Sequence, residues 1–290
     1  RIPLLDHGYI IPVDYMGTMD CIAEAARVSY GEGTAKIKDN LGLLRYLYSH
    51  RHMSPFEMAE IKFEIKLPVF VMRQWIRHRT ANVNEYSARY SLMLREFYIP
   101  RLENMAAQSV SNKQGRELIP MNVEEAKAYT MQMEDACNKA FETYEFLVSD
   151  TVEVYDGAGY PHKESSTPLA RELSRIILPV NAYTKCVWKC DVRNLLNLIS
   201  LRFDSHAQYE IRVYAEAIFN VVQKWMPEVA TAFVDYTLEA YNLSRMEVEA
   251  IKYAITTPQQ AELAISKLQR DGATKREINQ FRNKFLGEHL

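Results

Sequence analysis

Residues 59–79 read AEIKFEIKLPVFVMRQWIRHR, a strand signal followed directly by a helix signal. Apolar and charged side chains alternate through the first half, with Ile61, Phe63, Ile65 and Leu67 against Lys62, Glu64 and Lys66. This period of two predicts a strand with one buried side and one solvent-facing side. Pro68 ends the strand and suits the first turn of a helix, which we expect to run to about Arg79.

Other stretches of the chain add helices and a few strands. Alternation at 182–190 predicts a second strand, and residues 96–99 can form a short third one. Helices are predicted at 18–29, 39–50, 122–148, 167–178, 191–203 and about 205–225. Their start signals are Asn122 with Glu125, Thr167-Pro168, Asp191, and either Asp204 or Ser205, and Ser54-Pro55-Phe56-Glu57 resembles the capping box of a short helix. The sequence predicts an α+β fold, a helix-rich mixed domain whose small central sheet is flanked by long helices.

We divide the chain into a main domain at 1–240 and a helical C-terminal extension at 241–290. Within the main domain, residues 101–165 form an insertion with one long helix. The turn formers at 150–166 indicate a connection. The extension has three helix-start signals, namely Ser244 with Glu247, Thr257-Pro258, and Thr274 with Glu277.

The composition is that of a globular protein: 48% of the 290 residues are hydrophobic, 25% are charged, and the net charge is −2. That charge argues against a nucleic-acid coat and against a polybasic membrane binder. Four cysteines do not make a disulfide framework, and no apolar run approaches the roughly 18 residues of a membrane span. No signal peptide is visible in RIPLLDHGYI, so we expect a cytoplasmic protein without a membrane or nucleic-acid partner.

The common nucleotide and metal motifs are missing or incomplete. The stretch GEGTAK at 31–36 lacks the third glycine of a dinucleotide fingerprint and follows a helix signal. No GxxxxGK phosphate loop or GxSxG elbow occurs. His50 and His52 lack the further ligands of a metal site, so we predict no metal. Cys186 and Cys190 share one face of a predicted strand, where we expect them to pack in the core.

The chemistry is concentrated in residues 73–90, RQWIRHRTANVNEYSARY, where four arginines stand against one carboxylate. Guanidinium groups can grip phosphate or carbonyl oxygens with two hydrogen bonds. Arg73 and Arg77 lie one helical turn apart, on one face. A solvated basic helix face is the plain alternative. The polar residues that follow, including Asn82, Asn84 and Ser87, favour a site for a small polar anion.

Three blocks of this sequence resemble the flavin-dependent thymidylate synthase family. The first is Arg77-His78-Arg79, then seven residues, then Ser87, within NEYSARY at 84–90. The second is HMSPFE at 52–57, and the third runs from Arg175 to Arg212. All three occur in the order that the family shows.

The resemblance implies a reaction and its cofactors. Family members methylate dUMP to dTMP, with carbon from methylenetetrahydrofolate and hydride from an FAD that NADPH reduces. They are homotetramers whose active sites lie where subunits meet. Arginines suit such a site because they keep their charge at any working pH.

The resemblance also implies the site residues. Arg202, Ser87 and His52 lie at the reacting atoms. The contacts to dUMP come from Gln74, Arg77, Glu85, Tyr86, Ser87, Ala88, Arg89, Arg175 and Arg202. The contacts to FAD come from Ser54, Glu57, Arg77, His78, Arg79, Glu85, Arg193 and Asn197.

Individual roles follow from the same resemblance. Arg202 contacts the uracil ring and stabilises negative charge on its imide; its alternative role is a salt bridge to Asp204 or Glu210. Ser87 is not interpreted as a nucleophile, because only His78 lies in its local window and an unactivated serine attacks poorly. His52 resembles a histidine near the flavin and the folate.

The sequence departs from the family pattern at one position near the site, and two other functions are possible interpretations of the same residues. Asp191 stands where family members can have Asn, so we leave it out of the site. A non-catalytic RNA-binding protein would use the Arg73–Arg89 cluster with Trp75, Tyr86 and Tyr90 as stacking platforms. A serine hydrolase would need Ser87 and His78, but it lacks the elbow.

Overall fold

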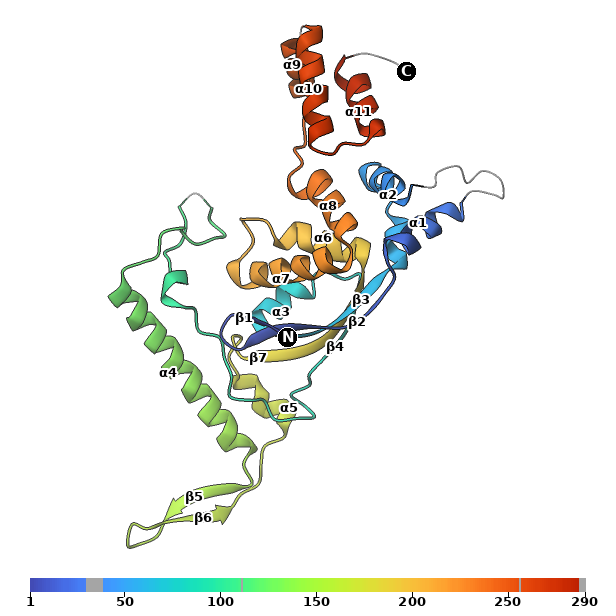
Figure 1. Ribbon diagram of the computed structural model, residues 1–290. Helices are drawn as coiled ribbons and strands as arrows, with labels where there is room; N and C mark the ends of the chain where they lie inside the picture. Colours follow the sequence, from blue (N-terminus) through green and yellow to red (C-terminus); the bar gives the residue numbers. More distant parts are fainter. Residues whose placement is uncertain (30–38, 111, 256, 287–290) are drawn as a thin grey trace.

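The computed structural model describes residues 1–29, 39–110, 112–255 and 257–286, so the GEGTAK stretch lies outside the described residues. A five-stranded antiparallel sheet in the order β1-β2-β3-β7-β4 forms the centre of the fold (Figure 1). The strands are β1 Ile2–Leu4, β2 Gly8–Met16, β3 Glu60–Pro68, β7 Tyr183–Asp191 and β4 Asn82–Glu85. With the surrounding helices, this sheet confirms the α+β class.

The alternation that predicted β3 has the expected physical result. Phe63 lies opposite Trp188 of β7 and is fully buried, as are the other apolar residues of the strand. On the opposite face, Lys62 pairs with Asp14 at 3.3 Å, and Glu60 pairs with Lys189 of β7 at 2.6 Å. Strand β3 therefore has one buried apolar side and one solvent-facing side, as predicted, and ion pairs lie on the solvent-facing side.

Helices α3 (Val69–Trp75), α6 (Val192–Arg202) and α7 (Tyr209–Trp225) cover the apolar face (Figure 1). The Trp75 ring meets the Trp188 ring edge-on, with centroids 5.4 Å apart. Tyr214 of α7 donates a hydrogen bond to the carbonyl of Lys66 at 2.7 Å. Aromatic packing of this kind fixes the end of α3, and with it the chain that follows.

Several helix boundaries differ from the prediction. Helix α3 ends at Trp75 and not at Arg79, because the chain turns there to enter β4. Helix α5 (Arg171–Ser174) begins after Ala170, so Thr167-Pro168 was the wrong start. Helix α7 begins after Gln208, and Asp204 instead accepts from the amide of His206 in a local turn. Short polar side chains often satisfy such turns instead of capping a helix.

The remaining predictions for the main domain gave mixed results. Ser54 opens a short 3-10 helix, η1 (Ser54–Met58), but its side chain makes no cap hydrogen bond, so the capping box was wrong. Helices α1 (Met19–Arg27) and α2 (Asn40–Ser49) were predicted correctly. Cys186 and Cys190 are buried on one face of β7, as expected.

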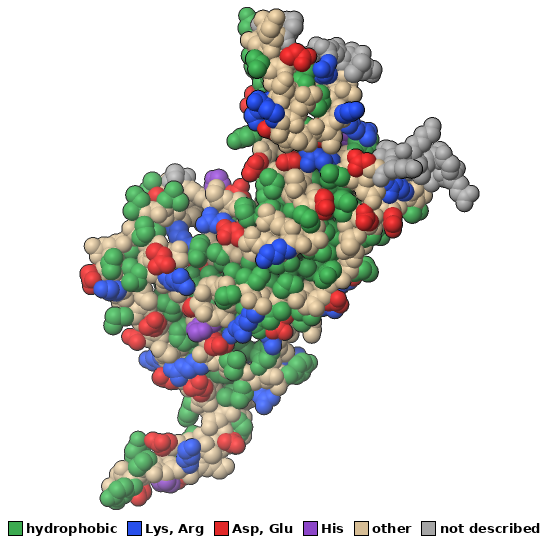
Figure 2. Space-filling view, viewed as in Figure 1, with side chains coloured by type: hydrophobic (Ala, Val, Ile, Leu, Met, Phe, Trp, Pro, Cys, Tyr) green, Lys and Arg blue, Asp and Glu red, His purple; other side chains and the backbone are tan. Residues whose placement is uncertain are grey.

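Residues 101–165, expected to form an insertion, contain helix α4 (Val123–Val148). Asn122 caps this helix, because its side chain accepts from the amide of Glu124 at 2.8 Å. The predicted connection after it is instead a hairpin, β5 (Thr151–Tyr155) and β6 (Pro161–Ser165), which projects from the body (Figures 1 and 2). The predicted strand at 96–99 is reduced to one bridge between Phe97 and Ala182.

The C-terminal helices are α8 (Pro227–Phe233), α9 (Arg245–Ala254), α10 (Pro258–Arg270) and α11 (Lys275–Phe281), with π-helical turns at Val234–Leu238 and Arg282–Leu286. Ser244, Thr257 and Thr274 each form the predicted cap. Helix α11 returns to lie beside α2 (Figure 1). Among the described helices, none is both long enough and apolar enough to cross a bilayer.

Candidate active site

The Arg77-His78-Arg79 segment follows the buried end of α3. Arg77 and Arg79 are exposed, whereas the His78 ring packs toward Trp188 with centroids 6.3 Å apart. Burial lowers the pKa of His78; a hydrogen bond with the backbone of Asn194 opposes this effect, and the nearby charge of Arg202 adds to it. Its Nε2 is buried and has no hydrogen-bond partner among the described residues. His78 therefore offers a neutral imidazole with one free nitrogen.

That imidazole borders a small cavity of about 160 Å³. Its lining is mostly apolar, namely Met72, Trp75, Ile76, His78, Arg79, Ala81, Val83 and Trp188. A small apolar cavity with one unpaired nitrogen suits the edge of a flat heterocycle.

A second cavity, of about 420 Å³, lies where β4 leads into the following loop. Five predicted nucleotide contacts line it together: Glu85, Tyr86, Ser87, Ala88 and Arg175. The Glu85 carboxylate accepts from the hydroxyl of Thr184 at 2.8 Å, which fixes its orientation. Arg175 makes no ion pair with the described residues. The cavity thus combines an unpaired cation with hydroxyl groups, a donor set for phosphate.

The loop that borders this cavity is held by its own hydrogen bonds. The Tyr86 hydroxyl donates to the carbonyl of Leu92 at 2.6 Å, and the Ser87 hydroxyl accepts from the amide of Arg89 at 3.3 Å. The Arg89 guanidinium pairs with Glu172 at 3.3 Å. None of the described histidines contacts Ser87, which removes the base that a serine hydrolase requires.

The other predicted nucleotide contacts form a separate group at the ends of α3 and α6. Gln74 donates to the side chain of Gln208 at 2.5 Å, and Arg202 approaches the Gln74 carbonyl at 3.5 Å. Neither predicted alternative partner pairs with Arg202: Asp204 binds His206, and Glu210 binds Arg116. A half-buried guanidinium without a carboxylate is a ready partner for an anion. Gln74, Arg77 and Arg202 do not line the 420 Å³ cavity.

Four of the eight predicted flavin contacts lie on η1 and α6, namely Ser54, Glu57, Arg193 and Asn197. Glu57 of η1 forms an ion pair with Arg193, and Arg193 and Asn197 share the exposed face of α6. Asp191, left out of the site, caps α6 by accepting from the amide of Asn194 at 3.0 Å. Its structural role explains why a carboxylate serves there, since Asp and Asn are both good N-caps.

His52 lies in the turn between α2 and η1. Its ring faces that of Tyr46 edge-on, with centroids 6.1 Å apart, and is 6.4 Å from that of His50. The two histidines belong to no group of metal-ligand type among the described residues. His52 therefore precedes η1 in the chain, and η1 carries Ser54 and Glu57, two of the predicted flavin contacts.

One buried charged cluster escaped the sequence reasoning. The Glu210 carboxylate, 3% exposed, accepts from the Tyr98 hydroxyl at 3.1 Å and from Arg116 at 3.3 Å. Burial, and then the charge of Glu210, raise the pKa of Tyr98. The cluster borders a cavity of about 770 Å³ that Gln208 also lines. Arg116 lies in a polar, irregular stretch with no periodicity, so no sequence signal identified it.

Known proteins resemble this chain over most of its length. A family profile described as Thymidylate synthase complementing protein matches residues 13–228. The flavin-dependent thymidylate synthase of Ruegeria pomeroyi (strain ATCC 700808 / DSM 15171 / DSS-3) is 48% identical over 250 residues, covering 86% of this chain and 78% of the relative. The enzyme of the same description from Rickettsia prowazekii (strain Madrid E) is 48% identical over 256 residues, covering 88% and 85%.

A solved structure agrees in fold. The UMP/dUMP methylase PolB from Streptomyces cacaoi, bound with 5-Br dUMP, has a TM-score of 0.67 and 29% identity, and the match covers 81% of this chain and 98% of that one. Helices α9 to α11 lie beyond the residues that the family profile matches.

Proposed function

This chain belongs to the flavin-dependent thymidylate synthase family, and we propose on that premise that it methylates dUMP to dTMP. The carbon comes from methylenetetrahydrofolate, and the hydride comes from an FAD that NADPH reduces. Supporting this is the 420 Å³ cavity, where Glu85, Tyr86, Ser87, Ala88 and Arg175 come together from distant parts of the chain. We place the catalytic domain at 1–240, with the 101–165 insertion inside it and the 241–290 extension after it.

The residues near α6 fit a flavin. Arg77, Arg79 and Arg193 supply guanidinium groups for its phosphates, and the free Nε2 of His78 can bond to a polar ring edge. Bound FAD supplies the redox chemistry. The protein supplies the position: Asp191 caps α6, and the helix then presents Arg193 and Asn197 on one face.

In the nucleotide site, Arg202 supplies charge to the uracil. Its guanidinium, without a carboxylate partner among the described residues, stabilises negative charge on the imide as the ring becomes nucleophilic. No protein thiol is needed. Cys186 lies opposite Glu85 in the sheet, and burial raises the pKa of its thiol to about 12, so it stays protonated.

We further propose a homotetramer in which two subunits complete each site. Gln74 and Arg202 do not line the cavity that Ser87 and Arg175 line in one chain, although both groups would contact dUMP. Apolar side chains around the cavity are more than half exposed, namely Tyr90, Ile176 and Val180. Exposed apolar groups beside an open polar site are typical of an interface.

The RNA-binding alternative loses physical support. Trp75 is 1% exposed and packs against Trp188, so it cannot stack on a base. On the face shown in Figure 2, basic and acidic side chains are interspersed instead of forming one basic stripe.

A spectroscopic and kinetic experiment tests the proposed function. The purified chain, supplied with FAD, should show the visible absorbance of oxidised flavin, lose it on adding NADPH, and then convert dUMP to dTMP with methylenetetrahydrofolate. Arg202→Ala should lower turnover by about 100-fold or more, because charge stabilisation is lost. Cys186→Ala is the matched control and should keep turnover. A chain that binds no added FAD, or a Cys186→Ala variant as inactive as Arg202→Ala, contradicts the proposal.

A further inference from the structure

The C-terminal helices dock on α2 through a half-buried charged cluster. Arg45 of α2 pairs with Asp235 at 2.7 Å and with Glu277 of α11 at 2.6 Å. The Tyr236 hydroxyl donates to the same Glu277 carboxylate, and the Arg45 guanidinium lies 5.2 Å from the centre of the Tyr236 ring. Arg45 and Glu277 are both largely buried, so these contacts fix α11 against α2.

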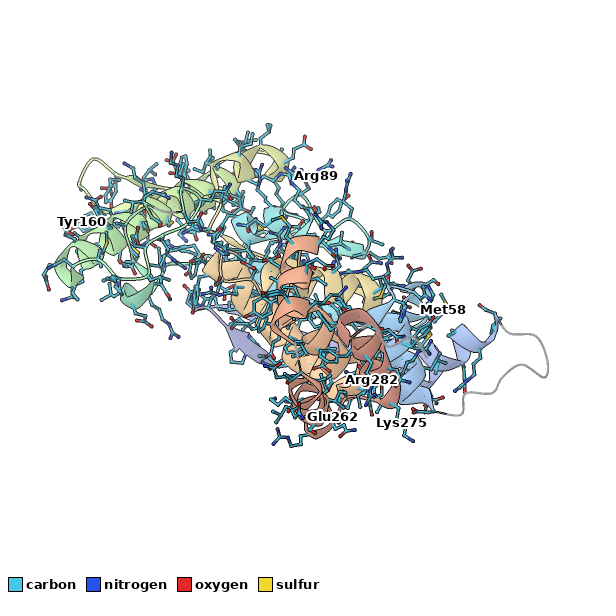
Figure 3. The ribbon with its side chains drawn as sticks, turned by 90° about the horizontal axis from the view of Figure 1, so that it is seen from above. Met58, Arg89, Tyr160, Glu262, Lys275 and Arg282 are labelled. Atoms are coloured by element: carbon cyan, nitrogen blue, oxygen red, sulfur yellow. The ribbon has the colours of Figure 1, made fainter. Side chains whose placement is uncertain are left out.

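From this anchor, α11 reaches the end of α2. In Figure 3, the view from above, α11 begins at the labelled Lys275 and lies over α2. The Arg276 guanidinium stands 3.4 Å from the centre of the Tyr46 ring. The side-chain amide of Gln280 lies 3.4 Å from Nε2 of His50. Two side chains of α11 therefore contact the last turn of α2.

Tyr46 and His50 in turn contact the candidate catalytic histidine. The Tyr46 ring is 4.1 Å from the His50 ring and 6.1 Å from the His52 ring. His50 Nδ1 is 2.9 Å from the Tyr46 carbonyl, so donation to that carbonyl leaves Nε2 as an acceptor for Gln280. A continuous chain of contacts thus links α11 to His52.

The turn that carries His52 holds one residue in left-handed backbone. The amide of Arg51 donates to Tyr48 and the amide of His52 donates to Leu47, which is a Schellman ending. The residue in left-handed backbone is Arg51, with φ 57°, where glycine is the usual choice. Such a conformation persists only when neighbouring contacts hold it.

We propose that Arg276 and Gln280 of α11 are positioning residues for the His50–His52 turn, so that the C-terminal extension supports the active site. This inference rests on the proposed function for the role of His52. The guanidinium of Arg276 holds the Tyr46 ring, the amide of Gln280 holds the His50 ring, and together they set the plane of His52. Helix α11 lies beyond residues 13–228, the part of the chain that the family profile matches.

Amide hydrogen exchange of the full chain tests the positioning without using activity. In Arg276→Ala, exchange at Arg51 and His52 should accelerate about 2- to 5-fold, the effect of losing one exposed cation–π contact. Arg276→Lys should restore most of the protection. Arg270→Ala is the matched control, an exposed arginine on α10, and should leave exchange at the turn unchanged. Unchanged exchange in Arg276→Ala overturns the proposal, whatever the flavin experiments show.

Kinetics then test the link to catalysis. With the melting temperature unchanged, Arg276→Ala should raise the KM for methylenetetrahydrofolate or lower kcat about 2- to 5-fold while the KM for dUMP stays constant. In a Tyr46→Leu background, Arg276→Ala should have no further effect. Faster exchange with unaltered kinetics would show that the turn does not serve the reaction, and would overturn the role given to the extension.

Discussion

At the residue scale, Arg51 stores conformational energy beside the site. Its left-handed backbone, φ 57°, costs an L residue roughly 1–2 kcal/mol because Cβ crowds the following carbonyl. Its neighbours His50 and His52 both contact the Tyr46 ring of α2. The strain therefore lies in the same turn as a candidate catalytic group, which is where strained backbone often occurs.

Arg51→Gly should raise the free energy of unfolding by about 0.5–1 kcal/mol, because relief of crowding exceeds the entropy that glycine adds to the unfolded chain. Arg51→Val should lower it, since a β-branched residue fits this region worst. Urea denaturation of the three proteins at one protein concentration measures both changes. If the glycine variant is the least stable of the three, the left-handed backbone of Arg51 does not destabilise the protein.

At the scale of elements, burial decided what could be predicted. Strand β3 was predictable because its pleat is apolar on one side, whereas all four residues of β4 are exposed and show no alternation. The β5–β6 hairpin, also without a buried face, was interpreted as a connection. The sequence also predicted that Arg193 and Asn197 share one face of α6, and it singled out the Arg77–Ser87 signature. The contact of α11 with Tyr46 was not, because it joins residues 230 positions apart.

The docking of α11 should depend on pH. Burial alone would raise the pKa of Glu277, but hydrogen bonds from Arg45, Tyr236 and the Thr274 amide outweigh it and lower the pKa to about 2. Since the ordinary value is 4.5, the stabilisation is complete above about pH 4.5 and is lost as pH falls toward 2. It amounts to on the order of 2–3 kcal/mol.

Thermal denaturation over that pH range measures the effect. Glu277→Gln should be less stable than the wild type at neutral pH, and the difference should shrink as the solution is acidified. Glu262→Gln, which removes an exposed carboxylate from α10, is the control and should parallel the wild type. Parallel profiles for Glu277→Gln and the wild type would show that the Glu277 carboxylate does not stabilise docking.

At the scale of the whole molecule, the residues proposed to contact dUMP fall into two groups within one chain. Ser87 and Arg175 line one cavity, whereas Gln74 and Arg202 lie at the ends of α3 and α6. If two subunits supply these parts to each site, then a defect in one part can be compensated by an intact part from a neighbour.

Mixing two inactive variants tests this arrangement. Arg202→Ala and Arg175→Ala, each with little turnover alone, should regain up to about a quarter of wild-type activity after mixed refolding in equal amounts, because about one site in four would receive two intact parts. Mixing Arg202→Ala with Gln74→Ala, whose changes lie in the same part, is the control and should restore nothing. Equal recovery in both mixtures would contradict sites shared in this way.

Helix α6 has a consequence for how such a site can vary. Arg193 stands at its first turn and Arg202 at its last, nine residues later, so the two lie about 14 Å apart along the axis and on opposite sides. A single inserted residue would swing Arg202 by about 100° and lengthen the separation. If Arg193 holds the flavin and Arg202 the pyrimidine, as proposed, the length of α6 sets the distance between the two ligands. Substitutions along it can be tolerated where a change in residue count cannot.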